Sequence, residues 1–115
     1  MNFGSVSLLN VARGATSTVT LTCAQPVTAA IALDYGQSGT GPTQRHMQSG
    51  GRSITYGVYQ DAAWSRPWGQ TIGTDTLSVP MSGTVASVSA YGLIPIQPTP
   101  APGTYVDVIN VIVTY

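Results

Sequence analysis

Apolar and polar residues alternate along several short stretches of the chain. The clearest alternation covers residues 17–23, where Val19, Leu21 and Cys23 fall on one face and threonines fall on the other. This period of two is typical of a half-buried strand. After a short break the alternation resumes over residues 27–33, with small residues on the outer face. The two stretches together predict a pair of neighbouring strands joined as a hairpin.

Four further stretches, rich in Val, Ile, Tyr and Thr, predict strands by the same pattern. They cover residues 53–60, 76–81, 84–93 and 104–115. The segments between them are rich in Gly, Ser, Gln and Pro, which indicates loops. Residues 35–51 predict a long loop or a weak edge segment, and residues 61–73 predict a loop that holds both tryptophans. Six or seven short strands without helical periodicity predict an all-β fold, an immunoglobulin-like β-sandwich with a barrel as the alternative.

The last predicted strand is apolar on both faces. One face carries Tyr105, Ile109, Val111, Val113 and Tyr115 around Asp107, and the other carries Val106, Val108 and Ile112. An exposed edge on such a strand recruits other chains, because its backbone N–H and C=O groups lack partners. The segment is therefore either a central strand covered on both sides or an edge that another strand is meant to join.

Charged residues are scarce. They make up 7% of the 115 residues, against roughly 25% in typical soluble domains, and the net charge is zero. The four arginines are scattered, so no basic patch of the kind that binds nucleic acid is expected. No apolar run reaches the length of about 18 residues that a transmembrane helix needs. The length predicts one domain over residues 1–115.

Groups for catalysis are also scarce. The chain has one His, one Cys and four Asp. A pair of Cys23 and His46 is conceivable, but Cys23 shares an apolar face with Val19 and Leu21, where a thiol is inert. A structural zinc site needs four N or S ligands, and only two such residues exist. The sequence therefore predicts no enzyme, no metal and no cofactor. Trp68 is expected to cap the core, and Trp64 is expected either to cap the core as well or to make a surface contact.

Five segments in a fixed order carry a family resemblance. They are Phe3-Gly4 followed by TVTLTC, RHMQSGGRSITYGVYQDAAW, WGQTIGTDT, YGLIPIQPTPAPGTYVD and the terminal VIVTY. Together they resemble the spore coat protein U family, which includes the subunits of archaic chaperone–usher pili. Against the usual pattern of that family, Val108 and Ile112 stand where threonines are common, and Trp64 stands where arginine is usual.

The resemblance implies an incomplete immunoglobulin-like sandwich that a donor strand completes. It implies a subunit of an exported fibre or spore coat, held by a periplasmic chaperone, passed to an outer-membrane usher and joined to neighbouring copies at the cell surface. The alternative is an adhesin-type domain at a fibre tip that binds through loop aromatics such as Trp64. The implied groove has two walls. The last strand contributes Ile109, Val111, Val113 and Tyr115, and the early strand contributes Val6 and Leu8.

The resemblance also implies a fate for Cys23. Family members carry a cysteine in an N-terminal stretch that pairs with the one at this position, and often a donor strand before it. This chain begins at Met1, just before Phe3. It is therefore expected to accept a donor strand without donating one, and to leave the disulfide partner of Cys23 outside the chain.

Overall fold

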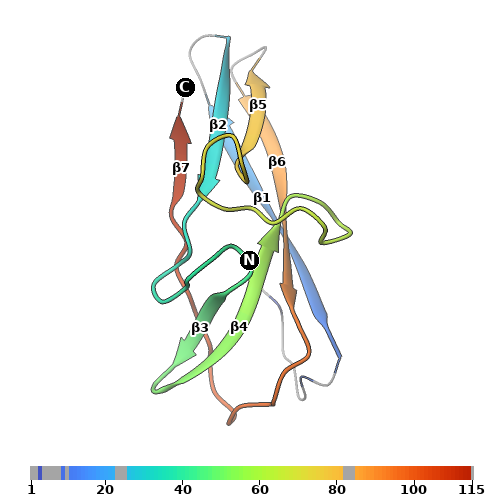
Figure 1. Ribbon diagram of the computed structural model, residues 1–115, viewed down its shortest axis with the longest axis vertical. Helices are drawn as coiled ribbons and strands as arrows, with labels where there is room; N and C mark the ends of the chain where they lie inside the picture. Colours follow the sequence, from blue (N-terminus) through green and yellow to red (C-terminus); the bar gives the residue numbers. More distant parts are fainter. Residues whose placement is uncertain (1–2, 4–8, 10, 23–25, 82–84, 115) are drawn as a thin grey trace.

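The computed structural model describes residues 3, 9, 11–22, 26–81 and 85–114. The molecule is elongated, with principal extents of 48 × 22 × 22 Å (Figure 1). The described residues contain strands and no helix. The strands are β1 (Arg13–Thr22), β2 (Val27–Leu33), β3 (Arg45–Ser49), β4 (Arg52–Tyr59), β5 (Leu77–Met81), β6 (Val85–Ile94) and β7 (Val111–Thr114).

The strands form two antiparallel sheets that face each other (Figure 1). The first has the order β1-β6-β4-β3 and the second the order β5-β2-β7. Alternate side chains of both sheets point inward to a shared core, as an immunoglobulin-like sandwich requires. The edge strand β5 includes Pro80, which lies opposite Thr28; an edge tolerates a proline because one side of the strand needs no N–H donor.

The predicted hairpin of residues 17–23 and 27–33 is wrong. β1 pairs with β6, from Arg13 opposite Ile94 to Thr22 opposite Val85, whereas β2 pairs with β5 and β7. The chain thus crosses from one sheet to the other between them. The reason is that each strand has one apolar face, and crossing places the two faces against each other in the core. Alternation shows which face is buried but does not show which strand is the neighbour.

Two ambiguous segments are resolved as edges. Within residues 35–51, β3 forms the edge of the four-stranded sheet and pairs with β4. In the last predicted strand, residues 111–114 form β7, which pairs with β2 alone among the described strands. The preceding residues are extended and are joined to β3 by a single bridge between Val106 and Gln48. Among the strands that the structure describes, β7 is therefore an edge.

Trp68 ties the two sheets together inside the core. Its side chain is 0% exposed. The indole Nε1 donates a hydrogen bond to the Ile31 carbonyl of β2 at 2.8 Å, and its backbone N–H donates to the Val58 carbonyl of β4 at 2.9 Å. The core around it also includes Leu33, Tyr56, Val79, Ala90 and Ile94. Trp68 therefore caps the core, as its place in a long loop predicts.

Gln97 continues the first sheet where β6 ends. Pro95 has no N–H, so it cannot extend the ladder along β4. The Gln97 side chain replaces the missing peptide: Thr55 N–H donates to its Oε1 at 3.0 Å, and its Nε2 donates to the Thr55 carbonyl at 2.8 Å. Gln97 N–H also donates to the Leu9 carbonyl at 3.1 Å. These bonds anchor the proline-rich connection that leads to β7.

Candidate functional site

A groove opens between the two sheets beside β7. Its cavity volume is about 290 Å³. β1 is the edge of one sheet and β7 the edge of the other, and within the described residues no strand covers the outer edge of either. The groove is lined mainly by apolar side chains from both sheets and from the segment before β7: Phe3, Ser17, Val19, Leu33, Met47, Tyr56, Val58, Ala90, Tyr105, Val106, Asp107, Ile109 and Val111.

Among the described residues, the backbone of β7 has one side paired with β2 and one side without a partner strand, which we call the free side. Asp34 N–H donates to the Asn110 carbonyl at 3.1 Å, which makes these two residues a hydrogen-bonded pair. The ladder continues with Leu33 opposite Val111 and Ile31 opposite Val113. Because hydrogen-bonded pairs alternate in an antiparallel ladder, the backbone groups of residues 112 and 114 point to β2 and those of Val111 and Val113 point away from it. The free side therefore offers a row of donors and acceptors to a further strand.

The residues expected to form the groove are placed as follows. Ile109 and Val111 line the cavity, and Val113 is half-buried against the core on the same face. Tyr115, Val6, Leu8 and Cys23 lie outside the described residues. The described wall opposite β7 is formed by Ser17 and Val19 of β1. In the sequence, these two residues lie on the face of residues 17–23 that the alternation predicts to be buried.

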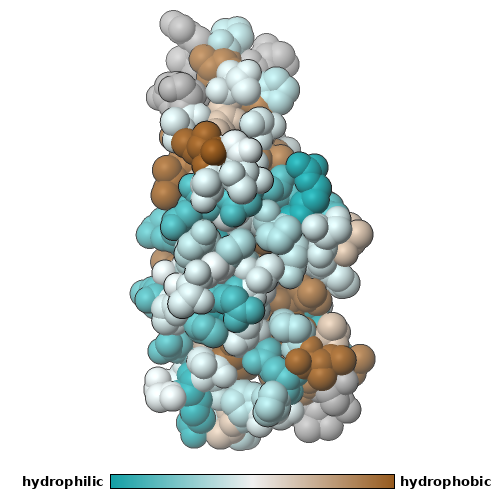
Figure 2. Space-filling view, viewed as in Figure 1, coloured by the Kyte–Doolittle hydropathy of each residue, from teal (hydrophilic) through white to brown (hydrophobic). Residues whose placement is uncertain are grey.

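The outer face of the last segment is exposed and apolar. Val106 is 61% exposed, Val108 56% and Ile112 47%. Val111, at the mouth of the groove, is 45% exposed. Figure 2 shows apolar side chains near β7 at the upper left, and a second group at the lower right of the molecule. The segment is thus apolar on both faces, as the sequence predicts, without being covered on both.

Asp34 clamps the start of β7 to the end of β2. Its Oδ1 accepts hydrogen bonds from Asn110 N–H at 2.9 Å and Gly36 N–H at 3.0 Å, and its Oδ2 accepts one from Asn110 Nδ2 at 2.8 Å. Burial raises the pKa of the Asp34 carboxyl, but these bonds and the Arg45 guanidinium outweigh it and lower the pKa below its usual value. The carboxylate is therefore ionised near neutral pH and holds Asn110 in place.

Asp107 makes one end of the groove polar. Tyr56 OH donates to its Oδ2 at 2.7 Å, and Gln37 N–H donates to its Oδ1 at 3.0 Å. Gly36 has a φ of +76°, and a Cβ there would lie 2.0 Å from Oδ2, so only glycine fits beneath the carboxylate. The ring of Phe3 packs edge-on against Tyr56, with centroids 6.1 Å apart. An apolar groove thus ends at a carboxylate and a phenol.

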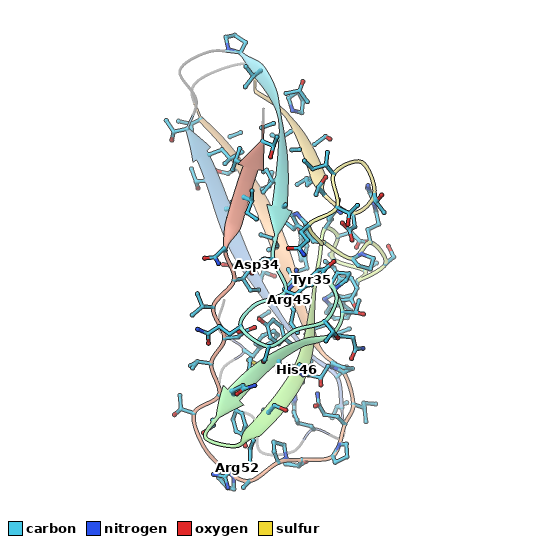
Figure 3. The ribbon with its side chains drawn as sticks, turned by 60° about the vertical axis from the view of Figure 1, so that its left-hand side comes forward. Asp34, Tyr35, Arg45, His46 and Arg52 are labelled. Carbon is cyan, nitrogen blue, oxygen red and sulfur yellow. The ribbon has the colours of Figure 1, made fainter. Side chains whose placement is uncertain are left out.

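Arg45 is fully buried beneath the junction of β2 and β3. It is 0% exposed, and Figure 3 shows it beside Asp34 and Tyr35. Its guanidinium lies 5.8 Å from the centre of the Tyr35 ring. The guanidinium nitrogens donate to four carbonyls: Asp34 at 3.0 Å, Leu33 at 3.3 Å, Trp68 at 2.8 Å and Pro42.

Burial lowers the pKa of Arg45, yet an arginine stays charged in proteins. In the sequence, Arg45 is one of four scattered arginines, and nothing marks it as buried except that it begins an alternation in which Met47 also points inward.

Tyr56 gives the site a dependence on alkaline pH. Burial, together with donation to Asp107, raises the pKa of its phenol well above the usual value near 10. Because the folded pKa is the higher one, this stabilisation is complete below about pH 10 and is lost as the pH rises towards the folded pKa. We expect the melting temperature, followed by circular dichroism from pH 8 to pH 11.5, to fall less steeply in Tyr56→Phe than in the unmodified chain. Equal slopes would contradict this role for Tyr56.

Two further polar side chains that the structure describes are engaged in local hydrogen bonds. His46 Nδ1 shares a hydrogen bond with Thr55 Oγ1 at 3.2 Å on the outer side of β3. Asp61 accepts bonds from Ser65 and Arg66 within its own loop. In the part of the chain that the structure describes, no three His, Cys, Asp or Glu side chains gather as a metal site would need. The same residues include no helix that is long and apolar enough to cross a bilayer.

Trp64 lies on the surface, and part of its ring packs against β1. Its side chain is 39% exposed, and its φ is 54°. One side of the ring covers Gly14 of β1, where a Cβ would lie 2.7 Å from the Trp64 Cζ2 atom. The ring is thus partly held against the sheet, and part of it remains available for contact.

The family model of the Spore Coat Protein U domain matches residues 1–112. The chain belongs to the spore coat protein U domain family. This confirms the family that the five sequence segments indicate. No curated protein matches the chain in sequence.

A solved structure supports the fold of this spore coat protein U domain. It is the crystal structure of the CsuC–CsuE chaperone–tip adhesion subunit pre-assembly complex from the archaic chaperone-usher Csu pili of Acinetobacter baumannii. The TM-score is 0.72 at 20% identity, over 100% of this chain and 36% of that chain. The chain thus spans about a third of the length of the protein that it matches. The expectation of an all-β, immunoglobulin-like sandwich is confirmed.

Proposed function

We propose that this spore coat protein U domain is a structural subunit of an exported surface fibre, assembled by donor-strand complementation. The observation that carries the proposal is the free side of β7 next to an apolar groove. A strand from a neighbouring subunit would pair with the backbone groups of Val111 and Val113 and extend the three-stranded sheet. A periplasmic chaperone would hold the same place before assembly, and an outer-membrane usher would carry the subunit to the cell surface.

The geometry of the groove suits a strand better than a compact ligand. Strand addition satisfies backbone donors and acceptors along the edge, while alternate side chains enter the groove and fix the register. The floor offers Leu33, Val58 and Ala90, which are apolar and buried. The donor and the groove are different surfaces, so the contact does not close on itself and generates a fibre or a coat layer. The similar solved structure, a chaperone–subunit complex of such a pilus system, is in keeping with these partners.

The tip-adhesin alternative depends on Trp64. Its ring is 39% exposed, and part of its surface is used to cover Gly14. The edge of β7 and the groove beside it suit a tip subunit as well, since the similar solved structure is a complex of a chaperone with a tip adhesion subunit. We prefer the fibre-subunit function because the residue on which the adhesin alternative depends is partly packed against β1.

A self-complemented chain tests the proposal. We would extend the chain after Tyr115 with an Asn-Gly turn and about seven residues alternating Val and Thr, which fold back along β7 as a hairpin. The added strand should protect the amide protons of Val111 and Val113 from exchange by at least about 100-fold, while those of Ile112 and Thr114, which face β2, change little. The melting temperature should rise by on the order of 10 °C, since 1 kcal/mol corresponds to roughly 4 °C in a domain of this size.

The control is the same extension with Asp in place of each Val. It has the same length and turn but cannot enter an apolar groove, because burying an unpaired carboxylate is costly. Equal amide protection and equal melting temperatures for the two extensions would show that the groove does not accept a strand.

A further inference from the structure

A strand bound in the groove does not explain the outward-facing side chains of the last segment, Val108 and Ile112, which we call the outward row. A donor strand beside β7 covers the inward row and the free backbone edge, but Val108 and Ile112 point to the opposite face. They are 56% and 47% exposed. Between Val108 and Thr114 the sequence has no charged residue, no proline and no glycine. Natural edge strands are usually guarded by such residues against pairing with other chains.

Electrostatic repulsion does not keep a second copy of the chain away from this edge. The net charge is zero and charged residues make up 7% of the sequence, so two copies approach without long-range repulsion. The nearest carboxylates in the segment, Asp107 and Asp34, are engaged by hydrogen bonds from Tyr56 and Asn110. Whatever pairs with the edge must supply backbone donors and acceptors, which another β7 provides.

We propose that the free chain forms a two-fold dimer in which residues 106–114, which include β7, pair antiparallel with residues 106–114 of a second copy. An antiparallel strand pair is self-complementary, so each copy uses the same surface, as two-fold symmetry requires. A register centred on Asn110 places Ile109 opposite Val111 of the second copy in a hydrogen-bonded pair, because both have backbone groups on the free side. It also places Val108 opposite Ile112 in a non-hydrogen-bonded pair, where side chains approach most closely.

This pairing uses the backbone groups that the proposed donor strand would use. Dimerisation and strand acceptance therefore exclude each other at β7. In a fibre subunit of the proposed kind, such a dimer could not join the fibre until a donor strand displaced one copy. The inference goes beyond the fibre function and does not depend on it, because it rests on the edge and the outward row alone.

Sedimentation equilibrium of the purified chain tests the dimer. One chain has a mass of 11.9 kDa. We expect twice that mass for the unmodified chain at micromolar concentrations, and a monomer for the double variant Val108→Lys with Ile112→Lys. In the proposed register each introduced lysine faces a lysine of the other copy, and like charges directly opposite destabilise a strand pair. The dissociation constant should rise at least 100-fold.

Ile72→Lys is the matched control. Ile72 is 59% exposed in the loop before β5, so the change adds a charge and removes an exposed apolar side chain away from β7. It should leave the dimer intact. Since positions 108 and 112 are exposed, the lysine variants should keep the circular dichroism spectrum of the unmodified chain.

A monomeric unmodified chain at 100 µM, or a dimer that persists in the double lysine variant, would overturn the inference. The outcome is separable from that of the fibre function. The chain extended with Val and Thr should be monomeric, because its edge is filled. If the extension protects the amides of Val111 and Val113 but the unmodified chain is monomeric, only the dimer fails. If the unmodified chain is a dimer but the extension gives no protection, only the strand-accepting groove fails.

Discussion

Replacing Arg45 with methionine is expected to lower the free energy of unfolding by on the order of 4 kcal/mol, a large part of the 5–15 kcal/mol of a typical domain. The side chain is 0% exposed, and its guanidinium donates to four backbone carbonyls. Methionine fills a similar volume without any donor. Each buried carbonyl left without a partner costs about 1–3 kcal/mol, and entry of water recovers part of this.

The effect should reach β7 as well as the overall stability. Arg45 binds the carbonyls of Leu33 and Asp34, the residues from which the second sheet reaches the clamp on Asn110. Urea unfolding measures the loss of stability, and amide exchange at Asn110 measures release of the clamp. Arg45→Lys keeps the charge but has fewer donors. Its free energy of unfolding should lie between those of the unmodified chain and Arg45→Met.

Arg52→Met is the control for Arg45. Arg52 is exposed at the tip between β3 and β4, far from Asp34 in the view of Figure 3. Its replacement should change the free energy of unfolding by less than about 0.5 kcal/mol. Similar losses for Arg45→Met and Arg52→Met would contradict the role given to the buried arginine.

The sequence predicts the strands better than their partners. The alternation in residues 17–23 and the composition of residues 53–60 and 84–93 identify β1, β4 and β6, because burial of one face imposes a period of two. The predicted hairpin failed because pairing depends on the whole sandwich. Thr22 lies opposite Val85, which no local pattern connects to it. Residues 35–51 were ambiguous because an edge strand such as β3 needs little apolar content.

For the candidate site too, the sequence is informative about single segments and not about contacts between distant ones. The two apolar faces of residues 104–115 leave open a central strand or an edge that another strand could join, and the pairing of β7 with β2 alone among the described strands favours the edge. The polar end of the groove could not be found from the segment alone. Tyr56 and Asp107 are 51 residues apart in sequence, and Gln37 and Asp107 are 70 apart. Contacts at such separations are set by the packing of the sheets, so a buried arginine or a phenol–carboxylate pair leaves little local trace.

The hydrogen bonds around β7 explain how an edge remains both ordered and free. Asp34 holds Asn110 from the β2 side, and Gln48 exchanges backbone bonds with Val106 from the β3 side. Val106 and Asn110 are four residues apart, so in an extended segment their backbone groups point to the same side, opposite to those of Val111 and Val113. These bonds fix the position and twist of the segment while leaving the backbone groups of Val111 and Val113 available. A pre-ordered edge loses less conformational entropy when a strand binds, which favours strand addition.

Trp68→Ala is expected to cost about 3–5 kcal/mol, whereas Trp64→Ala should cost less than about 1 kcal/mol. The two residues share a loop region but differ in burial, at 0% and 39% exposed. Removing the Trp68 side chain leaves a cavity between the sheets and removes the indole hydrogen bond to the Ile31 carbonyl. Trp64→Ala loses contact with Gly14 only, and in every fibre assay it should behave as the unmodified subunit if the tip-adhesin alternative is wrong.

Urea unfolding followed by circular dichroism measures both tryptophan variants without relying on the fluorophore that is removed. If Trp68→Ala does not fold, Trp68→Phe keeps the ring packing and removes only the indole donor, which should cost about 1–3 kcal/mol. Tryptophan emission gives an independent check, because the chain that retains only Trp68 should emit at shorter wavelength than the chain that retains only Trp64. Equal stability losses at the two positions would mean that the core does not depend on a cap at Trp68, and the link it makes between Ile31 and Val58 would then be dispensable.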